Sequence, residues 1–346
     1  MKAEHPRFPA GADSLIKKHL TPKVYAALSG KKTAAGFTLD AAIRSGLENP
    51  DSSIGIYIGD KDAYPLFEKV LAPIIREYHK LEADPFHTRV HRDDFSPVSL
   101  PAPDPEGSFI LSTRIRVARN LNSLPFCPHM TAQERVVLEK KTRDALLQLP
   151  KDLAGRYISF TDLGPENYDA LVAQKLAFAK GDRFQEAAGL NRDFPTARGV
   201  FLSRDKGFRV WVNEEDHLRI MALSTNADLS AVFNRLAKGL AHLSACLKFA
   251  FDPGLGFLSS CPTNIGTAMR AGVHIRLPKL DRQRDRLKEI VARHHLQIRG
   301  TGGEKTAVDE AVFDISNALR LGVSANQTVR DLHAGLLEII TLEKNL

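Results

Sequence analysis

The sequence predicts an α+β fold, in which a small all-helical N-terminal domain precedes a larger domain with a mostly antiparallel β-sheet flanked by helices. Three observations support this prediction. Residues 1–90 show helical periodicity and no strong strand, residues 91–108 are rich in proline and aspartate, and strands alternate with helices after residue 109. We therefore expect an N-terminal domain over 1–90, a linker over 91–108 and a catalytic α+β domain over 109–346.

The N-terminal helices carry recognisable boundary signals. Thr21 followed by Pro22 is typical of an N-cap with proline in the first turn. Residues 37–49 place apolar side chains on one helical face. Residues 64–81 predict a further helix, which we expect to be broken or offset at Pro73 because proline lacks a backbone N–H.

The second domain reads as an antiparallel sheet because hairpins and successive short strands dominate it. Capping boxes begin two of its helices, at Thr131 with Glu134 and at Ser324 with Gln327. The expected strands span 109–120, 157–160, 217–224, 272–278 and 296–300, with a hairpin over 200–215 and a short element at 312–317; the expected helices span 131–148, 228–250, 281–295 and a segment from 324.

The composition is that of an ordinary globular protein, with 43% hydrophobic and 26% charged residues among 346. No apolar run approaches membrane-spanning length, and the N-terminus lacks the apolar stretch of a secretory signal. The three cysteines are too scattered for a disulfide scaffold. We expect a cytoplasmic protein with no membrane partner.

The net charge of +7 raises the possibility of nucleic-acid binding. Nucleic-acid binders usually show a basic run interleaved with stacking aromatics, whereas the arginines here are dispersed. A site for a polyanionic small molecule fits better, and we expect no nucleic-acid partner.

His87 and His91 are four residues apart, a spacing that could place two metal ligands on a helix. Their proline-rich surroundings argue against a helix there, and no third ligand lies nearby in the sequence. Solvated linker histidines are therefore the favoured interpretation, and we expect no metal held directly by protein side chains.

Arginines recur at the expected strands and strand ends. Arg114 and Arg116 are two apart on one strand, so they share a face, although such a pair can simply face water. Arg219, Arg270 and Arg299 strengthen a binding hypothesis, since several guanidinium groups converging on one point would suit a triphosphate. The chain contains no P-loop motif.

Acidic residues and a cysteine could form the other half of such a site. Residues 213–216 (NEED) are either an exposed acidic turn or carboxylates that hold a cationic substrate, with Glu304 as partner. Cys261 is by default a buried inert thiol, but arginines nearby would lower its pKa. The glycine-rich segment 299–304 suggests a loop that closes over a ligand.

Five segments together resemble the phosphagen (guanidino) kinases over nearly the whole chain. They are STRIR (112–116), GDRF (181–184), WVNEEDHLR (211–219), CPTNIGTAMRAGVHI (261–275) and RGTGGE (299–304). These kinases move a phosphoryl group between MgATP and a guanidino compound. Their fold, a small helical domain followed by a larger one with an antiparallel sheet, agrees with the pattern described above.

The resemblance implies roles for individual residues. It implies an interdomain ion pair between Asp51 and Arg183, catalytic roles for Glu215, Glu304 and Cys261, and Mg²⁺ held through the nucleotide rather than by protein ligands. The implied substrate contacts are Ser53, Ile54, Gly55, Tyr57, Glu215, Cys261 and Glu304. The implied ATP/ADP contacts are Ser112, Arg114, Arg116, Lys175, Arg219, Arg270, His274, Arg299, Gly300, Thr301, Gly302 and Gly303.

Within the family the chain is most similar to arginine kinases. The short loop ending in Tyr57 and the position of Glu304 match them, whereas Gly302 matches creatine kinases and Lys175 replaces a common histidine. We expect ATP:L-arginine phosphotransfer by a monomer, although dimers occur in the family. The alternatives are a kinase for taurocyamine, lombricine or creatine, and a non-catalytic nucleotide-binding homologue.

Overall fold

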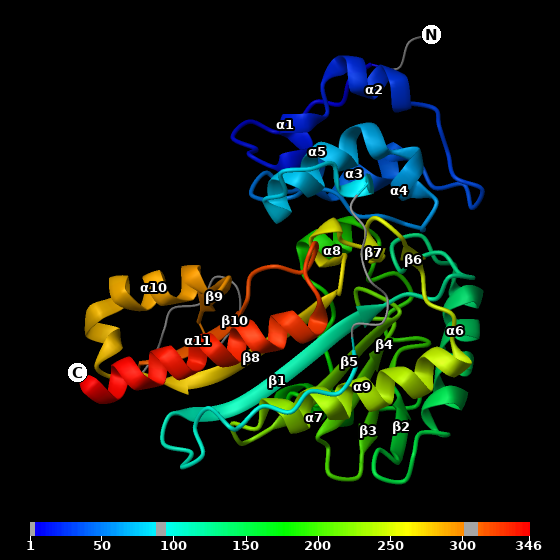
Figure 1. Cartoon of the computed structure of the whole chain (residues 1–346). Coiled ribbons are helices and arrows are strands. Elements are labelled where there is room, and N and C mark those ends of the chain that lie inside the picture. The colour runs from blue at the N-terminus through cyan, green and yellow to red at the C-terminus, as the bar shows by residue number, and fades with distance from the viewer. Residues whose placement is uncertain (1–3, 88–94, 301–310) are drawn as a thin grey trace.

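The computed structural model describes residues 4–87, 95–300 and 311–346. A group of N-terminal helices lies above an eight-stranded sheet, and two long helices cover the face of that sheet that is turned toward the viewer in Figure 1. The expected α+β architecture is confirmed.

The N-terminal region is helical, as predicted. Thr21 caps the second helix by accepting a hydrogen bond from the N–H of Val24. The loop between the third and fourth helices, residues 51–60, contains no helix or strand. The helices are α1 (Leu15–His19), α2 (Pro22–Leu28), α3 (Leu39–Glu48), α4 (Ala63–Leu66) and α5 (Glu68–His79), and a 3₁₀ turn η1 (Pro85–His87) follows them.

The predicted break at Pro73 is wrong. Pro73 lies inside α5, and the interruption falls at Phe67, which leaves helical geometry between α4 and α5. A proline inside a helix costs about 3 kcal/mol. The helix continues because Val70 and Ile74, with two further apolar residues of the same helix, are fully buried, and burying each such side chain returns about 1.5–3 kcal/mol.

The large sheet has the strand order β2-β3-β4-β5-β1-β8-β10-β9, and every neighbouring pair is antiparallel. The hairpin predicted over 200–215 is β3 and β4. The strands are β1 (Ile110–Arg119), β2 (Gly155–Ser159), β3 (Gly199–Ser203), β4 (Phe208–Val212), β5 (Leu218–Ser224), β8 (Met269–Arg276), β9 (Leu296–Arg299) and β10 (Val312–Asn317), with a separate small pair β6 (Phe251–Asp252) and β7 (Gly256–Phe257).

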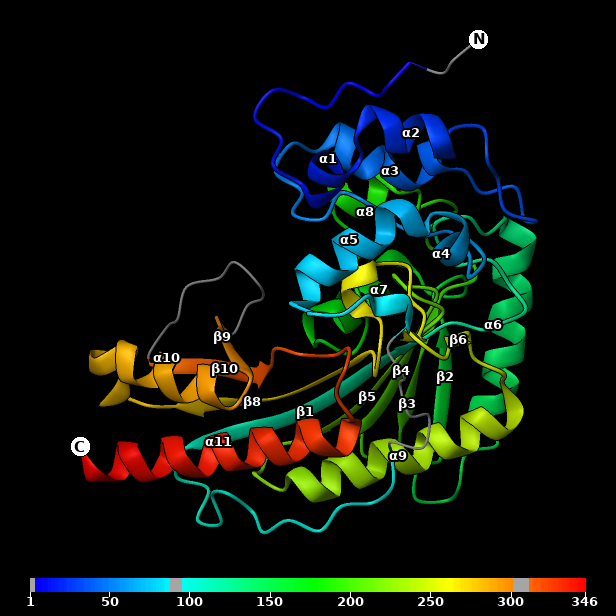
Figure 2. The same cartoon turned by 45° about the horizontal axis from the view of Figure 1, so that its top comes forward.

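Helices α9 and α11 run side by side across one face of this sheet (Figure 2). The sequence did not predict α7, α8, β6 or β7. No helix of the described residues has both the length and the apolar character needed to cross a membrane. The helices are α6 (Ala132–Leu146), α7 (Pro165–Ala173), α8 (Arg183–Ala187), α9 (Leu229–Cys246), α10 (Arg284–Arg293) and α11 (Ala325–Asn345), with 3₁₀ turns η2 (Pro262–Asn264) and η3 (Leu280–Gln283).

Alternation along β1 separates the two faces of the sheet. Ile115 and Val117 are buried in the main hydrophobic core, together with Phe233 and Leu236 of α9. Since successive side chains of a strand point to opposite faces, the arginines between them point away from this core. The core therefore lies under α9 and α11, and the polar face of β1 is turned toward the N-terminal region.

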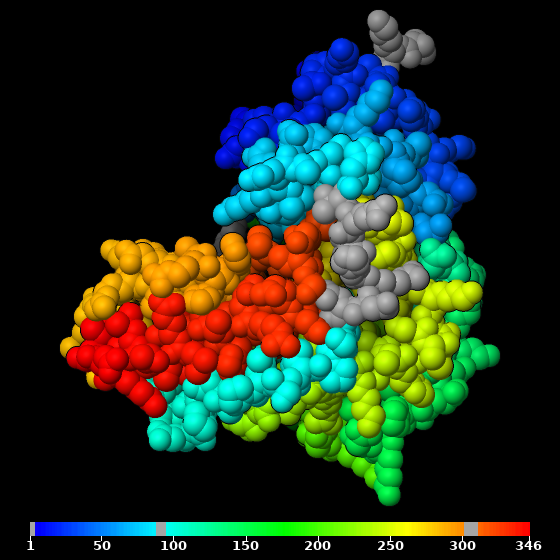
Figure 3. Space-filling view, in the orientation of Figure 1, coloured from blue at the N-terminus to red at the C-terminus, as the bar shows by residue number. Residues whose placement is uncertain are grey.

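A second core joins the N-terminal helices to the sheet domain. Ile43 and Ile58 share it with Phe126, Leu258 and Cys261 from the later part of the chain. Figure 3 shows the N-terminal region resting directly on the segment around residue 260. The helical region therefore packs as part of one body, and the division at 1–90, 91–108 and 109–346 stays a prediction.

The described part of the expected linker is packed rather than free. Residues 95–103 lie along α9, where the N–H groups of Val98 and Leu100 donate to Asn234 and Ser230 at 2.8 Å each. His87 is exposed, and His91 lies outside the described residues.

The two predicted capping boxes differ in outcome. At Thr131 both reciprocal bonds with Glu134 form, as predicted. At Ser324 the hydroxyl accepts from the N–H of Gln327, but the glutamine side chain bonds Asp331 instead of turning back. The Gln327 side chain donates to Asp331, one turn further along the helix, so only one of the two bonds of this capping box forms.

We predict that Thr131→Ala lowers the free energy of unfolding by about 1 kcal/mol, because the first turn of α6 loses a side-chain acceptor. Thr131→Ser keeps the hydroxyl and serves as the matched control. Urea unfolding followed by circular dichroism measures both variants. Equal stability of the alanine variant and the wild type would contradict the role of the box.

Candidate functional site

Strand register places the five predicted arginines on one face of the sheet. Arg116 of β1 pairs directly with Arg270 of β8, and Ala118 pairs with Arg219 of β5. Residues directly opposite in an antiparallel pair point to the same face. Arg299 reaches this face through β10, because its partner Asp314 also pairs with His274 of β8. We call the surface formed by Arg114, Arg116, Arg219, Arg270 and Arg299 the arginine face.

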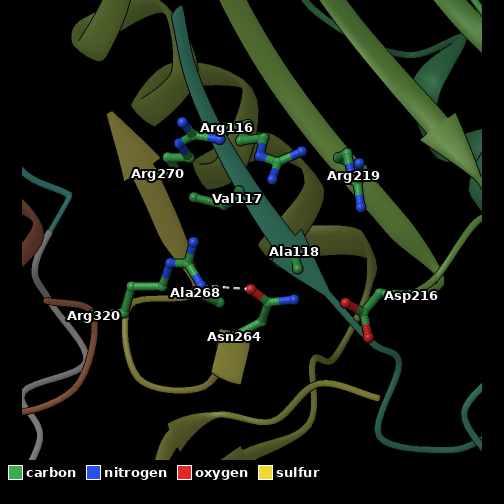
Figure 4. A pocket seen from close by; sticks show the side chains of 9 residues that line it. All are labelled: Arg116, Val117, Ala118, Asp216, Arg219, Asn264, Ala268, Arg270 and Arg320. Carbon is green, nitrogen blue, oxygen red and sulfur yellow. Dashed lines mark hydrogen bonds between the residues drawn. The ribbon is translucent and has the colours of Figure 1, made fainter. Parts of the chain in front are cut away.

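A hollow of about 290 Å³, open to solvent, lies over the arginine face. Figure 4 shows Arg116 between Arg270 and Arg219, each on a neighbouring strand, with Arg320 approaching from a loop. Asp216 and Asn264 complete the polar part of the wall. Three of the five predicted arginines, Arg116, Arg219 and Arg270, therefore line this hollow.

The arginines of this face repel one another. Burial lowers the pKa of Arg116 well below its usual range, and the positive charges of Arg219 and Arg114 lower it further. Loss of water around its guanidinium and the positive charges of Arg219 and Arg270 also lower the pKa of Arg114, whose side chain remains exposed on the strand. No ion pair is recorded for either residue in the part of the chain that the structure describes. A bound polyanion would relieve this repulsion, so the face has the charge that a phosphate-binding surface needs.

Among the described residues, Ser112, His274 and Lys175, which were also expected to contact the nucleotide, lie on or beside the arginine face. Arg270 donates to Asp314 at 2.8 Å and to Ser316 at 3.2 Å. Ser112 lies opposite His274 in the register. Burial lowers the pKa of His274, and nearby positive charges that include Arg114 and Lys175 lower it further, so Lys175 lies within electrostatic reach of the ring. Gly300 directly follows β9, while Thr301, Gly302, Gly303 and Glu304 lie outside the described residues.

The acidic turn of residues 213–216 is not an exposed turn. Arg219 holds Glu214 at 2.8 Å and Glu215 at 3.3 Å, and both carboxylates are largely buried. Asp216 makes different contacts, accepting from Asn120 at 2.6 Å and from the N–H of Ser260 at 2.7 Å at the wall of the hollow. The turn thus presents one carboxylate pair to the arginine face and uses the third acid to hold neighbouring loops.

Burial dominates the ionisation of these acids. It raises the pKa of Glu215 to about 7, helped by the negative charges of Asp216 and Glu214 and opposed by Arg219. Burial likewise raises the pKa of Asp216, while the hydrogen bonds from Ser260 and Asn120 oppose the change. A carboxyl that titrates near neutral pH can both attract a cation and accept a proton.

Cys261 lies within electrostatic range of Glu215, and its thiol is buried and not activated. Burial raises the pKa of Cys261 to about 12, and the negative charge of Glu215 adds to this. The hydrogen bond with Thr263, at 3.0 Å, only partly offsets the effect. The structure therefore agrees with the default interpretation of a buried inert thiol, and the alternative of a lowered pKa does not hold, because burial and the nearby carboxylates outweigh the hydrogen bonds to Thr263.

The loop of residues 51–60, which precedes α4, approaches Glu215 and Cys261. Tyr57 is within electrostatic range of Glu215 and Cys261, and with burial as the main cause these charges raise the pKa of its phenol. The carbonyls of Ser53 and Ile54 accept from the backbone of α1, which sets the course of the loop. Gly55 takes a positive φ of 69° against Ile16 and Ser14, where a side chain would not fit.

Asp51 and Arg183 form an ion pair between the N-terminal region and the sheet domain, as the resemblance implied. Arg183 also donates to Asn49 at 3.1 Å. Among the described residues, no group of three or more histidine, cysteine or acidic side chains is arranged to hold a metal ion.

The sequence analysis missed two polar residues of the hollow, Arg320 and Asn264. Arg320 donates to the carbonyl of Thr263 at 2.8 Å and to Asn264 at 2.6 Å, which anchors it at the rim. Arg320, Asn264 and Asp216 line the cavity. Arg320 lies in a loop between apolar residues, where no strand alternation marks its direction, so only the folded chain identifies it.

We predict that Glu215→Gln stabilises the protein at pH 8 by up to about 3 kcal/mol and has little effect at pH 5. The folded protein binds this proton more tightly than the unfolded chain, so the wild type loses stability as pH rises from about 4.5 to about 7. The glutamine has no charge to lose. Thermal unfolding at both pH values measures the difference, and an equal shift at both would contradict the raised pKa.

Comparison with known proteins agrees with this geometry. The family model "ATP:guanido phosphotransferase, C-terminal catalytic domain" matches residues 137–346, and the corresponding N-terminal domain model matches residues 10–76. An arginine kinase of Anthopleura japonica is 42% identical over 96% of this chain, which spans 47% of that relative's length. The arginine kinase Lit v 2 of Penaeus vannamei is 41% identical over 96% of this chain and 93% of its own.

Two solved structures share the fold. A lombricine kinase has a TM-score of 0.90 and 33% identity, with coverage of 98% of this chain and 94% of its own. The duplicated taurocyamine kinase from Schistosoma mansoni, with bound transition-state-analogue components, has a TM-score of 0.91 and 33% identity, covering 99% of this chain and 49% of its own. Both family models, the relatives and the arginine face lead to one conclusion: the chain belongs to the ATP:guanido phosphotransferase family and is a guanidino kinase.

Proposed function

We propose that this enzyme is an arginine kinase, which reversibly transfers the γ-phosphoryl group of MgATP to the guanidino group of L-arginine and yields phosphoarginine and ADP. The observation that carries the proposal is the meeting of an arginine-lined hollow with a buried glutamate next to the loop of Tyr57. The relatives at 41–42% identity, whose names specify arginine, support this choice of substrate.

In the proposed reaction a guanidino nitrogen attacks the γ-phosphorus in line. The N–P bond forms as the bond from the γ-phosphorus to the β–γ bridging oxygen breaks, and ADP leaves with that oxygen. The guanidinium groups of the arginine face stabilise charge on the phosphoryl oxygens. Mg²⁺ enters with the nucleotide as part of the substrate, because phosphate oxygens are its preferred ligands.

The acceptor is proposed to be held by Glu215, Glu304 and Cys261, with Ser53–Tyr57 enclosing its amino-acid end. A pKa of about 7 suits Glu215 to receive the proton that the guanidino nitrogen releases, and Glu304 is the alternative base. Orienting the nitrogen toward the phosphorus is the main contribution such residues can make.

The proposal extends to the enzyme's surroundings. We propose a cytoplasmic location, since Cys127, Cys246 and Cys261 are free thiols, and a monomer, as is usual for the arginine kinases that the sequence resembles. Neither nucleic acid nor membrane is proposed as a partner.

A panel of guanidino compounds tests the substrate. We expect L-arginine to give the highest kcat/KM in a coupled assay of ADP release with MgATP, above taurocyamine, lombricine and creatine, because the Tyr57 loop is short. A better rate with another member would overturn the choice of arginine alone. No ADP release with any compound would instead support a non-catalytic nucleotide-binding protein.

Arg270→Ala and Glu215→Gln test the two halves of the site. We expect each to lower kcat/KM by about a hundredfold or more while the protein stays folded, because each removes a charge aimed at the reacting groups. Arg286→Ala, on the exposed side of α10, is the matched control and should keep full activity. Wild-type activity in either site variant would refute the role assigned to that residue.

A further inference from the structure

The loop that carries Cys261 is buried, so its backbone groups must find hydrogen-bond partners within the protein. Ser259 and Ser260 are fully buried, and Cys261 is 6% exposed. Buried carbonyl groups that lose water need a hydrogen-bond donor within the protein. The groups that donate hydrogen bonds to the carbonyls of this loop therefore determine where the Cys261 thiol lies.

Three of the four carbonyls from residue 259 to residue 262 accept hydrogen bonds from the N-terminal region. The Tyr64 hydroxyl donates to Ser259 at 2.8 Å, the N–H of Ile58 donates to Ser260 at 2.7 Å, and Nε2 of His79 lies 2.9 Å from the carbonyl of Pro262. The fourth carbonyl, that of Cys261, is satisfied locally, by the Ser259 hydroxyl at 2.6 Å and by a backbone N–H.

The geometry points to Tyr64 and His79 as positioning residues for the phosphotransfer reaction: from the helical region they hold the Cys261 loop against Glu215 and the Tyr57 loop. The expected effect on kcat rests on the proposed function, whereas the expected effect on the reactivity of the Cys261 thiol does not.

The environments of the two side chains suit this role. Burial, with the negative charges near Cys261 and Asp216, raises the pKa of Tyr64 well above its usual range, so its hydroxyl remains a donor. Burial lowers the pKa of His79 to about 4, so the ring is neutral and its single N–H lies on the nitrogen that faces the carbonyl. Neither donor changes its protonation state across the physiological range.

Ile58 links this arrangement to the substrate loop. It follows Tyr57 directly, and its N–H bonds the residue directly before Cys261. The short path from Tyr57 through Ile58 and Ser260 to Cys261 therefore sets the spacing between two groups proposed to contact the same substrate. Such spacing matters because small misplacements of orienting groups are costly in rate.

The test uses the full chain with Cys246→Ser, which removes the exposed thiol and leaves Cys127 fully buried. Tyr64→Phe and His79→Leu each remove one donor, and His79→Gln keeps an N–H that can reach the carbonyl. Two measurements are made: the rate at which iodoacetamide alkylates Cys261, read by peptide mass spectrometry, and kcat and KM with MgATP and L-arginine.

We expect iodoacetamide to alkylate Cys261 about fivefold faster or more in Tyr64→Phe and in His79→Leu. A lost hydrogen bond to a buried carbonyl makes opening of the loop more frequent by about that factor. We also expect kcat to fall while the KM for MgATP stays unchanged. His79→Gln should restore both values toward wild type.

Matched controls separate positioning from general loosening. Tyr25→Phe removes a hydroxyl that donates to Asp40 within the helical region, and His129→Leu removes a ring that contacts the carbonyl of Ala35 across the same junction. Neither side chain hydrogen-bonds the Cys261 loop, so Cys261 should be alkylated at the wild-type rate in both controls.

An unchanged alkylation rate in Tyr64→Phe and His79→Leu, or an equal increase in His129→Leu, would overturn the inference. Faster alkylation with an unchanged kcat would overturn the positioning role as well. If the wild type phosphorylates no guanidino compound, the proposed function fails by itself, and the alkylation rates still decide whether these residues hold the loop.

Discussion

Repulsion among like charges on one face of the sheet is the constraint on which the site depends. Antiparallel register places Arg116 opposite Arg270 and brings Arg219 in from the other side. Burial and mutual repulsion lower the pKa of Arg116, so the folded chain bears an electrostatic cost that a polyanion can offset. The hydrophobic core under the opposite face supplies the stability that makes such a cost tolerable.

The acids beside this face limit the cost and give the site its second half. Glu214 and Glu215 pair with Arg219 and so neutralise one edge of the arginine cluster. Burial keeps the pKa of Glu215 near neutrality instead of letting the arginines depress it. Cations on one side and a carboxyl that titrates near neutrality on the other are the groups that the proposed transfer of a phosphoryl group onto a nitrogen would use.

The helical region contributes to the site through backbone contacts as much as through side chains. It shares a core with the segment around Cys261, and it donates to three successive or nearly successive carbonyls there. The ion pair of Asp51 and Arg183 lies at the same junction. Because buried backbone groups must be paired, the two parts of the chain specify one another's position.

The sequence by itself determined the class of fold, the outward face of β1 and the family, because side-chain alternation and contiguous motifs are local properties of the chain. Tertiary structure decided the rest. Whether Pro73 breaks its helix, whether Cys261 is activated and whether Arg320 lines the hollow all depend on which distant groups pack around them. Burial and the electrostatic influence of nearby charges depend on neighbours in space, and the sequence does not show which residues these are.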